Sequence, residues 1–300
     1  MRHFLNCWIG LVLATLFGCQ SPWQLNSRVF TPAGSFTAEV EGPAVDAAGN
    51  VYAVSYGTKP TIGKVTPEGK CELYLNMPEG STANGIRFCS KERMYLADYT
   101  GHNVLVVDKN RRITVFAHDP DMNQPNDLAI TDNDTFFASD PNWKEGTGQL
   151  WRIDADGTTA LLEKDMGTTN GIEVSPDNRT LYVNESVQRN VWAYDLDAQG
   201  NISNKRLLIQ FKDFGMDGMR CDVLGNLYIT RHAKGEVAII GPSGVQIGAV
   251  RLHGKEPTNI AFGGKDGRTC YVTLADRGNI ETFRAPHPGR SWAMRQKRKG

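Results

Sequence analysis

The 300-residue sequence lacks the features that mark several large classes of protein. Its 33 basic and 33 acidic residues balance, so no overall charge attracts it to nucleic acid or to an anionic membrane surface. No two of its six cysteines form a C-x-x-C pair, which argues against a thiolate zinc site. The G-x-S-x-G motif and the Ser, His, Asp arrangement of serine esterases are absent, as are long stretches with the 3.6-residue period of helical repeats. These absences leave other hydrolases and all-β folds to consider.

A long apolar run lies at the N-terminus, between Phe4 and Phe17, after the basic start Met1-Arg2-His3. The run is too short to span a bilayer, so it predicts a signal sequence instead of a transmembrane helix. It ends in Leu16-Phe17-Gly18-Cys19, which resembles a bacterial lipobox except at Phe17, where a small or β-branched residue is usual. We predict a signal peptide over residues 1–19, lipidation of Cys19, and export to the periplasmic side of a bacterial membrane. A plain cleaved signal is the alternative, and the lipid anchor would then be absent.

Four more cysteines follow this segment, namely Cys71, Cys89, Cys221 and Cys270. An oxidising compartment would permit disulfides between them. Buried free thiols fit the sequence equally well, because Cys89 and Cys221 lie in or near predicted strands, and both readings stay open. At the other end, residues 286–300 contain a run of basic residues and are predicted to be a solvated, frayed tail.

One structural unit recurs six times along the chain. Each copy contains a short strand with an aromatic residue, and successive copies are 42 to 46 residues apart. A period in the low forties, built of short strands and Gly, Asn or Asp turns, is typical of a β-propeller with one four-stranded blade per repeat. We predict an all-β, six-bladed propeller over residues 30–285, preceded by a short tether over 20–29. Pairing of the segment Arg28–Val40 with a strand at Asn279–Arg284 would close the ring. The aromatic positions are Tyr52, Tyr95, Phe137, Tyr182, Tyr228 and Tyr271.

An oxygen-bearing side chain precedes the aromatic strand in every repeat. Any single Asn-Gly pair is more often a turn than a ligand, but six oxygen residues at the same period favour a converging polar site. The first strand of each blade lines the central channel, so we expect these side chains to meet there. Carboxylates and amide carbonyls are hard ligands that suit Ca²⁺ or a similar divalent cation. The six residues are Glu41, Asn84, Asn126, Asn170, Asp217 and Asn259.

Nearly the whole chain after the signal resembles the family of senescence marker protein 30, gluconolactonase and the luciferin-regenerating enzyme. The resemblance is carried by Thr169 to Val183, by Asp217-Gly218-Met219 with Asn226-Leu227-Tyr228, and by Pro257 to Thr269. The segment Ser139-Asp140-Pro141, followed by Gly148 to Arg152, is similar to bacterial gluconolactonases. The resemblance implies one divalent metal in the channel, with Glu41, Asn126, Asn170 and Asp217 as its ligands. Calcium is the expected ion, with Zn²⁺, Mn²⁺ or Mg²⁺ as alternatives.

The chain departs from this family at two places. The usual opening, Glu-Gly-Pro followed by an aromatic residue, reads Glu41-Gly42-Pro43-Ala44 here, so the aromatic residue is lost. Animal members carry an arginine two places before the third-blade asparagine, where this chain has Gln124. We predict that Gln124, Asn84, Asn259 and Asp140 contact the substrate, although buried or channel-lining amides and a simple turn at Asp140 are equally compatible with the sequence.

The predicted reaction is hydrolysis of a sugar lactone, in which a metal polarises the carbonyl group and activates water. Asp217 is the candidate for accepting a proton from that water, and a role as ligand alone is the alternative. Two other functions remain open: hydrolysis of phosphotriesters or other esters at the same site, and a non-catalytic calcium-binding scaffold. We expect a small lactone as partner and a monomeric chain, with no nucleic acid and no membrane contact beyond the N-terminal anchor.

Overall fold

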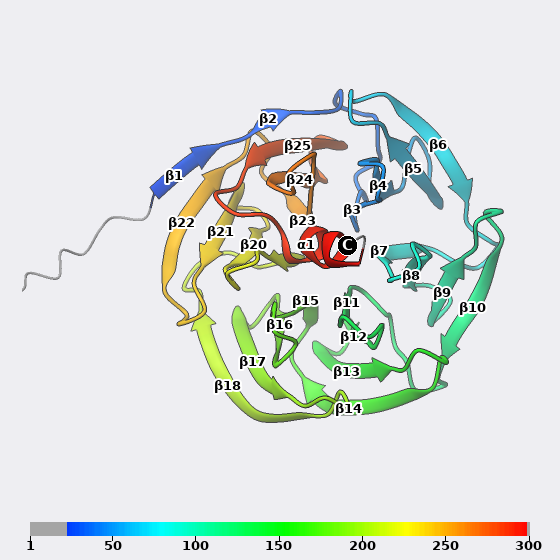
Figure 1. Ribbon diagram of the computed structural model, residues 1–300, viewed down its shortest axis with the longest axis vertical. Helices are drawn as coiled ribbons and strands as arrows, with labels where there is room; N and C mark the ends of the chain where they lie inside the picture. The colour runs from blue at the N-terminus through cyan, green and yellow to red at the C-terminus, as the bar shows by residue number, and fades with distance from the viewer. Residues whose placement is uncertain (1–22, 299–300) are drawn as a thin grey trace, which may run out of the picture.

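Six four-stranded blades form a closed ring around one axis in the computed structural model, which describes residues 23–298 (Figure 1). Within each blade the strands follow one another from the axis to the rim and pair antiparallel with their neighbours. The six-bladed propeller predicted from the repeats is therefore confirmed. The innermost strands of the six blades are β3 (Ala44–Val45), β7 (Ala83–Phe88), β11 (Leu128–Ile130), β15 (Thr169–Val174), β19 (Met219–Cys221) and β23 (Pro257–Gly263).

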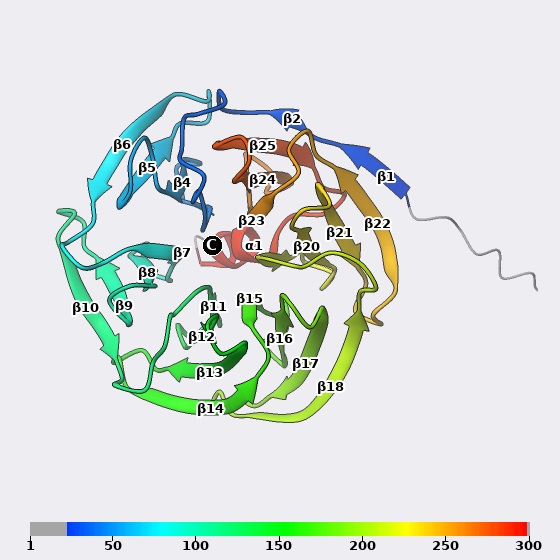
Figure 2. The ribbon, with the colours of Figure 1, turned by 180° about the vertical axis from the view of Figure 1, so that it is seen from behind.

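The remaining strands complete the blades in sequence order, seen from the opposite side in Figure 2. The second strands, which carry or adjoin the repeated aromatic residues, are β4 (Val51–Val54), β8 (Met94–Asp98), β12 (Phe136–Asn142), β16 (Thr180–Glu185), β20 (Leu227–Arg231) and β24 (Thr269–Leu274). The third strands are β5 (Thr61–Val65), β9 (Asn103–Val107), β13 (Thr147–Ile153), β17 (Asn190–Leu196), β21 (Glu236–Ile240) and β25 (Asn279–Arg284). The outer strands of the first five blades are β6 (Cys71–Asn76), β10 (Ile113–His118), β14 (Thr159–Met166), β18 (Ile202–Gln210) and β22 (Gln246–Arg251).

In two blades, the hairpin between the first two strands is built by an Asp and a Gly. In the first blade, the Asp46 carboxylate accepts hydrogen bonds from the backbone N–H groups of Ala48 and Asn50, at 2.9 and 2.8 Å. Gly49 closes the turn at φ +88°, a left-handed conformation that glycine adopts without a steric penalty. Asp222 and Gly225 repeat the arrangement in the fifth blade. These turns fix which residues pair across the hairpin. The pairing in turn decides which side chains face the neighbouring blades.

Apolar side chains from neighbouring blades pack against each other and form the core. Tyr95 of β8 and Phe136 of β12 are each 1% exposed, and their ring centroids are 4.4 Å apart. Burying a side chain of this size contributes about 1.5–3 kcal/mol relative to leaving it in water. The repeated aromatic positions therefore join adjacent blades in addition to marking the period.

The N-terminal strands close the ring and correct one predicted boundary. β2 (Arg28–Val29) is the outermost strand of the sixth blade and pairs antiparallel with β25, with Arg28 opposite Thr282. This confirms the predicted pairing of the N-terminal segment with Asn279–Arg284. β1 (Trp23–Asn26) adds a fifth, parallel strand to the fifth blade. The described part of the segment 20–29 is thus sheet and not a free tether, because its backbone groups pair with the exposed edges of two blades.

The C-terminal segment also differs from its prediction. Residues Arg290–Lys297 form helix α1, which lies over the channel axis in Figure 1. Arg290 donates hydrogen bonds to the carbonyl groups of Ile130 and Ser175, at 2.8 and 3.0 Å, and Arg295 donates one to the carbonyl group of Val45. Both arginines are buried, because their guanidinium groups satisfy carbonyl oxygens at the ends of innermost strands. The prediction of a frayed tail is therefore wrong for this helix, which closes one end of the channel.

Two further points concern the described residues 23–298. The four cysteines at 71, 89, 221 and 270 are free thiols, three of them buried, which decides between the two readings left open by the sequence. No helix in this part of the chain is long and apolar enough to cross a membrane. The predicted signal peptide and Cys19 lie outside the described residues.

Candidate metal and substrate site

A cavity of about 700 Å³ opens at the end of the channel opposite α1. Its floor contains Glu41, Asn126, Asn170 and Asp217, so the structure brings together all four residues predicted as metal ligands. Glu41, Asn126 and Asn170 are more than nine-tenths buried, and Asp217 is partly buried. The walls and rim mix apolar and charged side chains, including Lys59, Tyr99, Trp143, Val187, Arg189, Phe214, Met216 and His232.

The two floor asparagines present carbonyl oxygens that have no hydrogen-bond partner within the protein. Asn170 Nδ2 donates to Ser186 Oγ at 3.1 Å, and this hydroxyl donates in turn to the carbonyl of Met216. The fixed amide leaves Asn170 Oδ1 buried and unpaired, and Asn126 Oδ1 is in the same condition. A buried acceptor left without a donor costs about 1–3 kcal/mol. Two such oxygens on one cavity floor indicate that a ligand outside the chain satisfies them.

The two floor carboxyl groups lie close enough to interact directly. Burial, followed by the negative charge of Asp127, raises the pKa of Glu41 to about 7. Burial and the neighbouring Glu41 raise the pKa of Asp217 well above its usual range. Their interaction favours a proton on the pair when no cation is bound. A cation at this place would replace that proton.

The donor set fits a hard divalent cation. Glu41 and Asp217 offer carboxylate oxygens, and Asn126 and Asn170 offer the unpaired amide oxygens. Oxygen-only ligands of this kind are those that Ca²⁺ takes in proteins. Across residues 23–298 no group of three or more His, Cys, Asp or Glu side chains is placed to hold a metal. The combination of two carboxylates with two amides therefore distinguishes this site from imidazole or thiolate centres.

One register step below the floor, the channel axis is filled by two side chains. Asp127 and Asn259 occupy this level, while the other four blades have glycine there. A Cβ atom on Gly218 would lie 1.9 Å from Asn259 Cγ, and one on Gly85 would lie 2.8 Å from Asp127 Oδ1. The glycines therefore leave the space that the two polar side chains use.

Asn259 thus lies below the cavity and does not line it. Its Nδ2 donates to Glu41 Oε2 at 3.0 Å and lies 3.4 Å from Asp127 Oδ2. Thr258 takes the place in the sixth blade that the sequence assigned to Asn259. The substrate contact predicted for Asn259 is not supported by this position, since the side chain is fully buried and supports a floor carboxylate instead.

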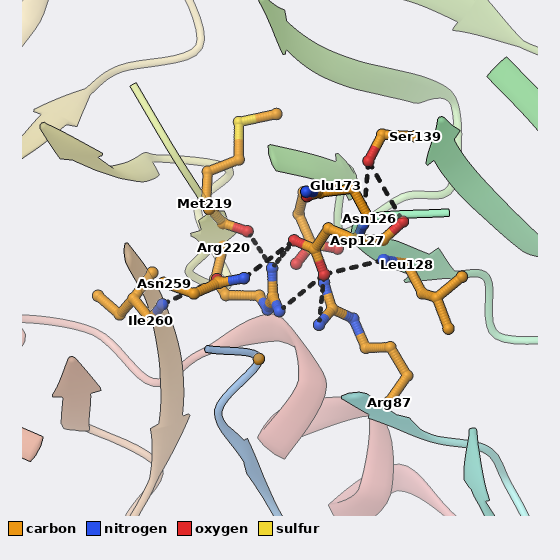
Figure 3. A network of polar contacts seen from close by, with 12 residues as sticks. Arg87, Asn126, Asp127, Leu128, Ser139, Glu173, Met219, Arg220, Asn259 and Ile260 are labelled. Atoms are coloured by element: carbon orange, nitrogen blue, oxygen red, sulfur yellow. Dashed lines mark hydrogen bonds and ion pairs between the residues drawn. The ribbon is translucent and has the colours of Figure 1, made fainter. Parts of the chain in front are cut away.

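Asp127 belongs to a buried ion-pair network that the sequence reasoning missed (Figure 3). Arg220 Nη1 lies 2.8 Å from Asp127 Oδ2, and Arg87 Nη1 lies 3.4 Å from Asp127 Oδ1. Burial works against ionisation of Asp127, but the two guanidinium groups hold its pKa below the usual value. The network carries fixed charge directly beneath the floor of the cavity.

The other three predicted substrate residues have different surroundings. Asn84 lines the cavity, and its Nδ2 donates to the backbone carbonyl of Asn126 at 3.1 Å. Gln124 lies in a separate surface hollow and does not line the cavity. Asp140 is fully buried and accepts hydrogen bonds from the Gln149 and Trp151 side chains and from two backbone N–H groups, at residues 123 and 124. Its carboxylate is saturated within the protein, so it holds the neighbouring loop and does not face a substrate.

Several cavity residues share a repeat position that the sequence reasoning did not use. Tyr99, Ser186 and His232 each follow the aromatic residue of their blade by four positions and line the cavity. This position lies just after the second strand, where the chain turns at the open end of the channel. Comparing the residues after each aromatic strand would have predicted these three as a group.

Comparison with known proteins identifies the family. The model of the SMP-30/gluconolactonase/LRE-like region matches residues 40–276. The chain belongs to this family. A gluconolactonase from Zymomonas mobilis is 26% identical over 286 residues, which cover 82% of this chain and 80% of that protein. A regucalcin from Xenopus laevis is 37% identical over 145 residues, about half of each chain (47% and 48%).

Solved structures of other family members show the same fold. A regucalcin from Agrobacterium tumefaciens, described as a calcium-binding protein, has a TM-score of 0.77 at 20% identity and covers 89% of this chain and 96% of its own. A gluconolactonase from Xanthomonas campestris has a TM-score of 0.74 at 17% identity, with the same coverage of both chains. At these sequence identities, the similarity shows that the chain has the same fold. It does not identify the substrate.

Proposed function

We propose that this protein is a sugar-lactone hydrolase that works with one divalent cation, most simply Ca²⁺. The observation that carries the proposal is the cavity floor, where two interacting carboxyl groups adjoin two unpaired amide oxygens. Relatives named gluconolactonase and pentonolactonase supply the substrate class, and a relative described as calcium-binding supplies the ion. They lend no support to phosphotriester hydrolysis or to a purely structural propeller.

The roles of the floor residues follow from their chemistry. Glu41, Asn126, Asn170 and Asp217 would hold the cation, which when bound stabilises negative charge on the lactone carbonyl oxygen. Asp217 accepts a proton from the attacking water at a carboxylate oxygen, because this carboxylate lies on the cavity floor beside the place where the cation would be held. Asn84 contributes an amide to the wall and orients a substrate hydroxyl group. The floor lies at the buried end of the cavity, which limits the access of bulk water to the reacting ester.

Hydrolysis of glucono-1,5-lactone by the purified protein tests the proposal. Acid release would be followed with a pH indicator after chelation and after adding back Ca²⁺, Zn²⁺, Mn²⁺ or Mg²⁺, with the spontaneous rate subtracted. We expect turnover to disappear on chelation and to return with at least one cation. Cation binding in the absence of turnover with any of these ions would refute the lactonase proposal.

The raised pKa of Glu41 predicts how the stability of the cation-free protein depends on pH. A folded pKa of about 7 against an ordinary value of 4.5 means that folding favours the protonated carboxyl group. The contribution of Glu41 to the free energy of unfolding is complete below about pH 4.5 and is lost as pH rises through about 7. Ca²⁺ requires the deprotonated form, so the increase in Tm that it gives over EDTA should grow from pH 5 to pH 8.

Thermal melts of the protein with Ca²⁺ or EDTA across that range would measure the effect. Glu41→Gln is the matched control, because it keeps the shape of the side chain but removes the titrating group. Its Ca²⁺ increment should be smaller and should change less with pH, because Asp217 is then the one titrating carboxyl group left on the floor. An increment in the unaltered protein that is equally large at pH 5 and pH 8 would contradict the assignment.

We also propose that the protein is exported and anchored through a lipid on Cys19. The basic start, the apolar run and the Leu16-Phe17-Gly18-Cys19 ending support this proposal. In a bacterial expression host, the protein should incorporate labelled palmitate and fractionate with membranes. Cys19→Ala should abolish both effects, whereas Cys71→Ala should leave them unchanged. Export of an unlabelled, soluble form would instead indicate a plain cleaved signal.

A further inference from the structure

The closed end of the channel contains a second, much smaller cavity of about 40 Å³ between the blades and α1. It is lined by residues of the innermost strands and by the first turn of the helix. A space of this size holds one or two water molecules or a single small ion. Four arginines line it, namely Arg87, Arg220, Arg290 and Arg295, together with one carboxylate, Glu173.

The guanidinium groups at this cavity outnumber the carboxylates that balance them. Asp127 is the shared partner of Arg87 and Arg220, and Glu173 lies 3.8 Å from Arg290. All five side chains are more than nine-tenths buried. Arg290 also reaches the half-exposed Asp132 at the surface, at 3.2 Å. Arg295 forms no ion pair within residues 23–298, so four guanidinium groups face three carboxylates. This part of the channel therefore keeps one uncompensated positive charge away from solvent, which is costly without a counterion.

One donor in this group has no partner. Arg87 Nη1 donates to the carbonyl of Ile86 at 3.0 Å, whereas Arg87 Nη2 is buried without a hydrogen bond. Burial and the adjacent Arg220 lower the pKa of Arg87 to about 10, which still leaves the group charged at neutral pH. Figure 3 shows the Arg87 and Arg220 side chains converging on Asp127, with α1 below them.

The helix contributes further positive potential to the same cavity. Arg290 and Ser291, the first two residues of α1, both line it. The N-cap residue, Gly289, provides no side-chain cap for the helix N–H groups. The N-terminal end of a helix carries a partial positive charge and favours an anion.

We propose that this cavity binds one small monovalent anion, of which chloride is the simplest example. The anion accepts a hydrogen bond from Arg87 Nη2 and neutralises the excess guanidinium charge between the blades and α1. A water molecule would satisfy the donor but would leave the charge uncompensated. The proposal concerns the closed end of the channel and is independent of the lactonase activity at the open end.

Crystals of the protein soaked in bromide test the proposal directly, because bromide replaces chloride and scatters X-rays anomalously. We expect an anomalous peak beside Arg87 Nη2, in contact with the first turn of α1. In solution, the protein should have a Tm about 3 °C higher in chloride than in methanesulfonate at the same ionic strength. The methanesulfonate ion is too large to enter the cavity.

Two variants sharpen the measurement. Arg87→Gln leaves Asp127 paired with Arg220 and should abolish the chloride-specific shift in Tm. Arg284→Gln removes an exposed arginine that pairs with Asp266 and should leave the shift unchanged. If Arg87→Gln does not fold, the bromide experiment on the unaltered protein decides alone. No anomalous peak, together with equal Tm in chloride and methanesulfonate, would show that the cavity holds water only and would overturn the proposal.

Discussion

Replacing Asp217 by Asn should reduce the kcat for lactone hydrolysis by about 10²–10⁴-fold, the range expected for loss of a general base. The substitution keeps the shape of the side chain but removes the carboxylate that interacts with Glu41 on the cavity floor. Steady-state hydrolysis of glucono-1,5-lactone measures the effect, and calorimetric titration with Ca²⁺ measures cation affinity in parallel. Both are needed, because Asp217 is proposed as ligand and as base.

Saturation with cation separates these two roles. If Asp217 handles the proton, the loss of kcat persists at Ca²⁺ concentrations that saturate the variant, and Glu41→Gln recovers more activity under the same conditions. Full recovery of Asp217→Asn would restrict the residue to cation binding. Glu39→Gln is a matched control, because Glu39 is an exposed carboxylate at the cavity mouth that hydrogen-bonds Thr37 and is not part of the floor. It should cause a much smaller change in kcat.

Replacing Asp127 by Asn should lower the free energy of unfolding by about 3–5 kcal/mol, the usual cost of removing one partner from a buried ion pair. Asp127 is fully buried and is the carboxylate shared by Arg87 and Arg220. Without it, two guanidinium groups face each other in the channel. Urea denaturation followed by circular dichroism measures the change.

An exposed ion pair in the same molecule provides the comparison. Arg206 lies 2.6 Å from Asp195, and each side chain is about half exposed (49% and 50%). Asp195→Asn should therefore lower the free energy of unfolding much less than Asp127→Asn does. Equal effects at Asp127 and Asp195 would mean that the buried network contributes no more than a surface pair.

The period of the sequence predicted the number of blades and a ring of six oxygen-bearing residues, because short strands and turns repeat with the geometry of a propeller. The family resemblance then selected the four that lie on the floor. The same reasoning misplaced Asn259, since it aligned the sixth blade by its amide side chain. The pairing of each inner strand with the second strand is the better guide: Ile260, Leu128 and Ile172 are equivalent and lie opposite Val272, Ala138 and Val183, respectively. That alignment places Thr258 on the floor and Asn259 beside Asp127.

Other features depend on contacts between distant segments that no local pattern encodes. Asp140 is saturated by donors from two other segments of the chain, so its sequence neighbours do not distinguish it from an exposed rim residue. The basic composition of α1 suggested a solvated tail, yet two of its arginines bind strand carbonyls that lie between 115 and 250 residues earlier in the chain. The burial of such residues becomes predictable only once the ring is known to have unpaired carbonyls at its axis.

Because Asp127 and Asn259 fill the channel below the floor and α1 covers its far end, the cavity is a blind pocket and not a passage. Substrate and product must therefore use the same entrance. In the proposed reaction, the carboxylate formed by hydrolysis would lie beside the cation until it diffuses out, so accumulated product should compete with fresh substrate.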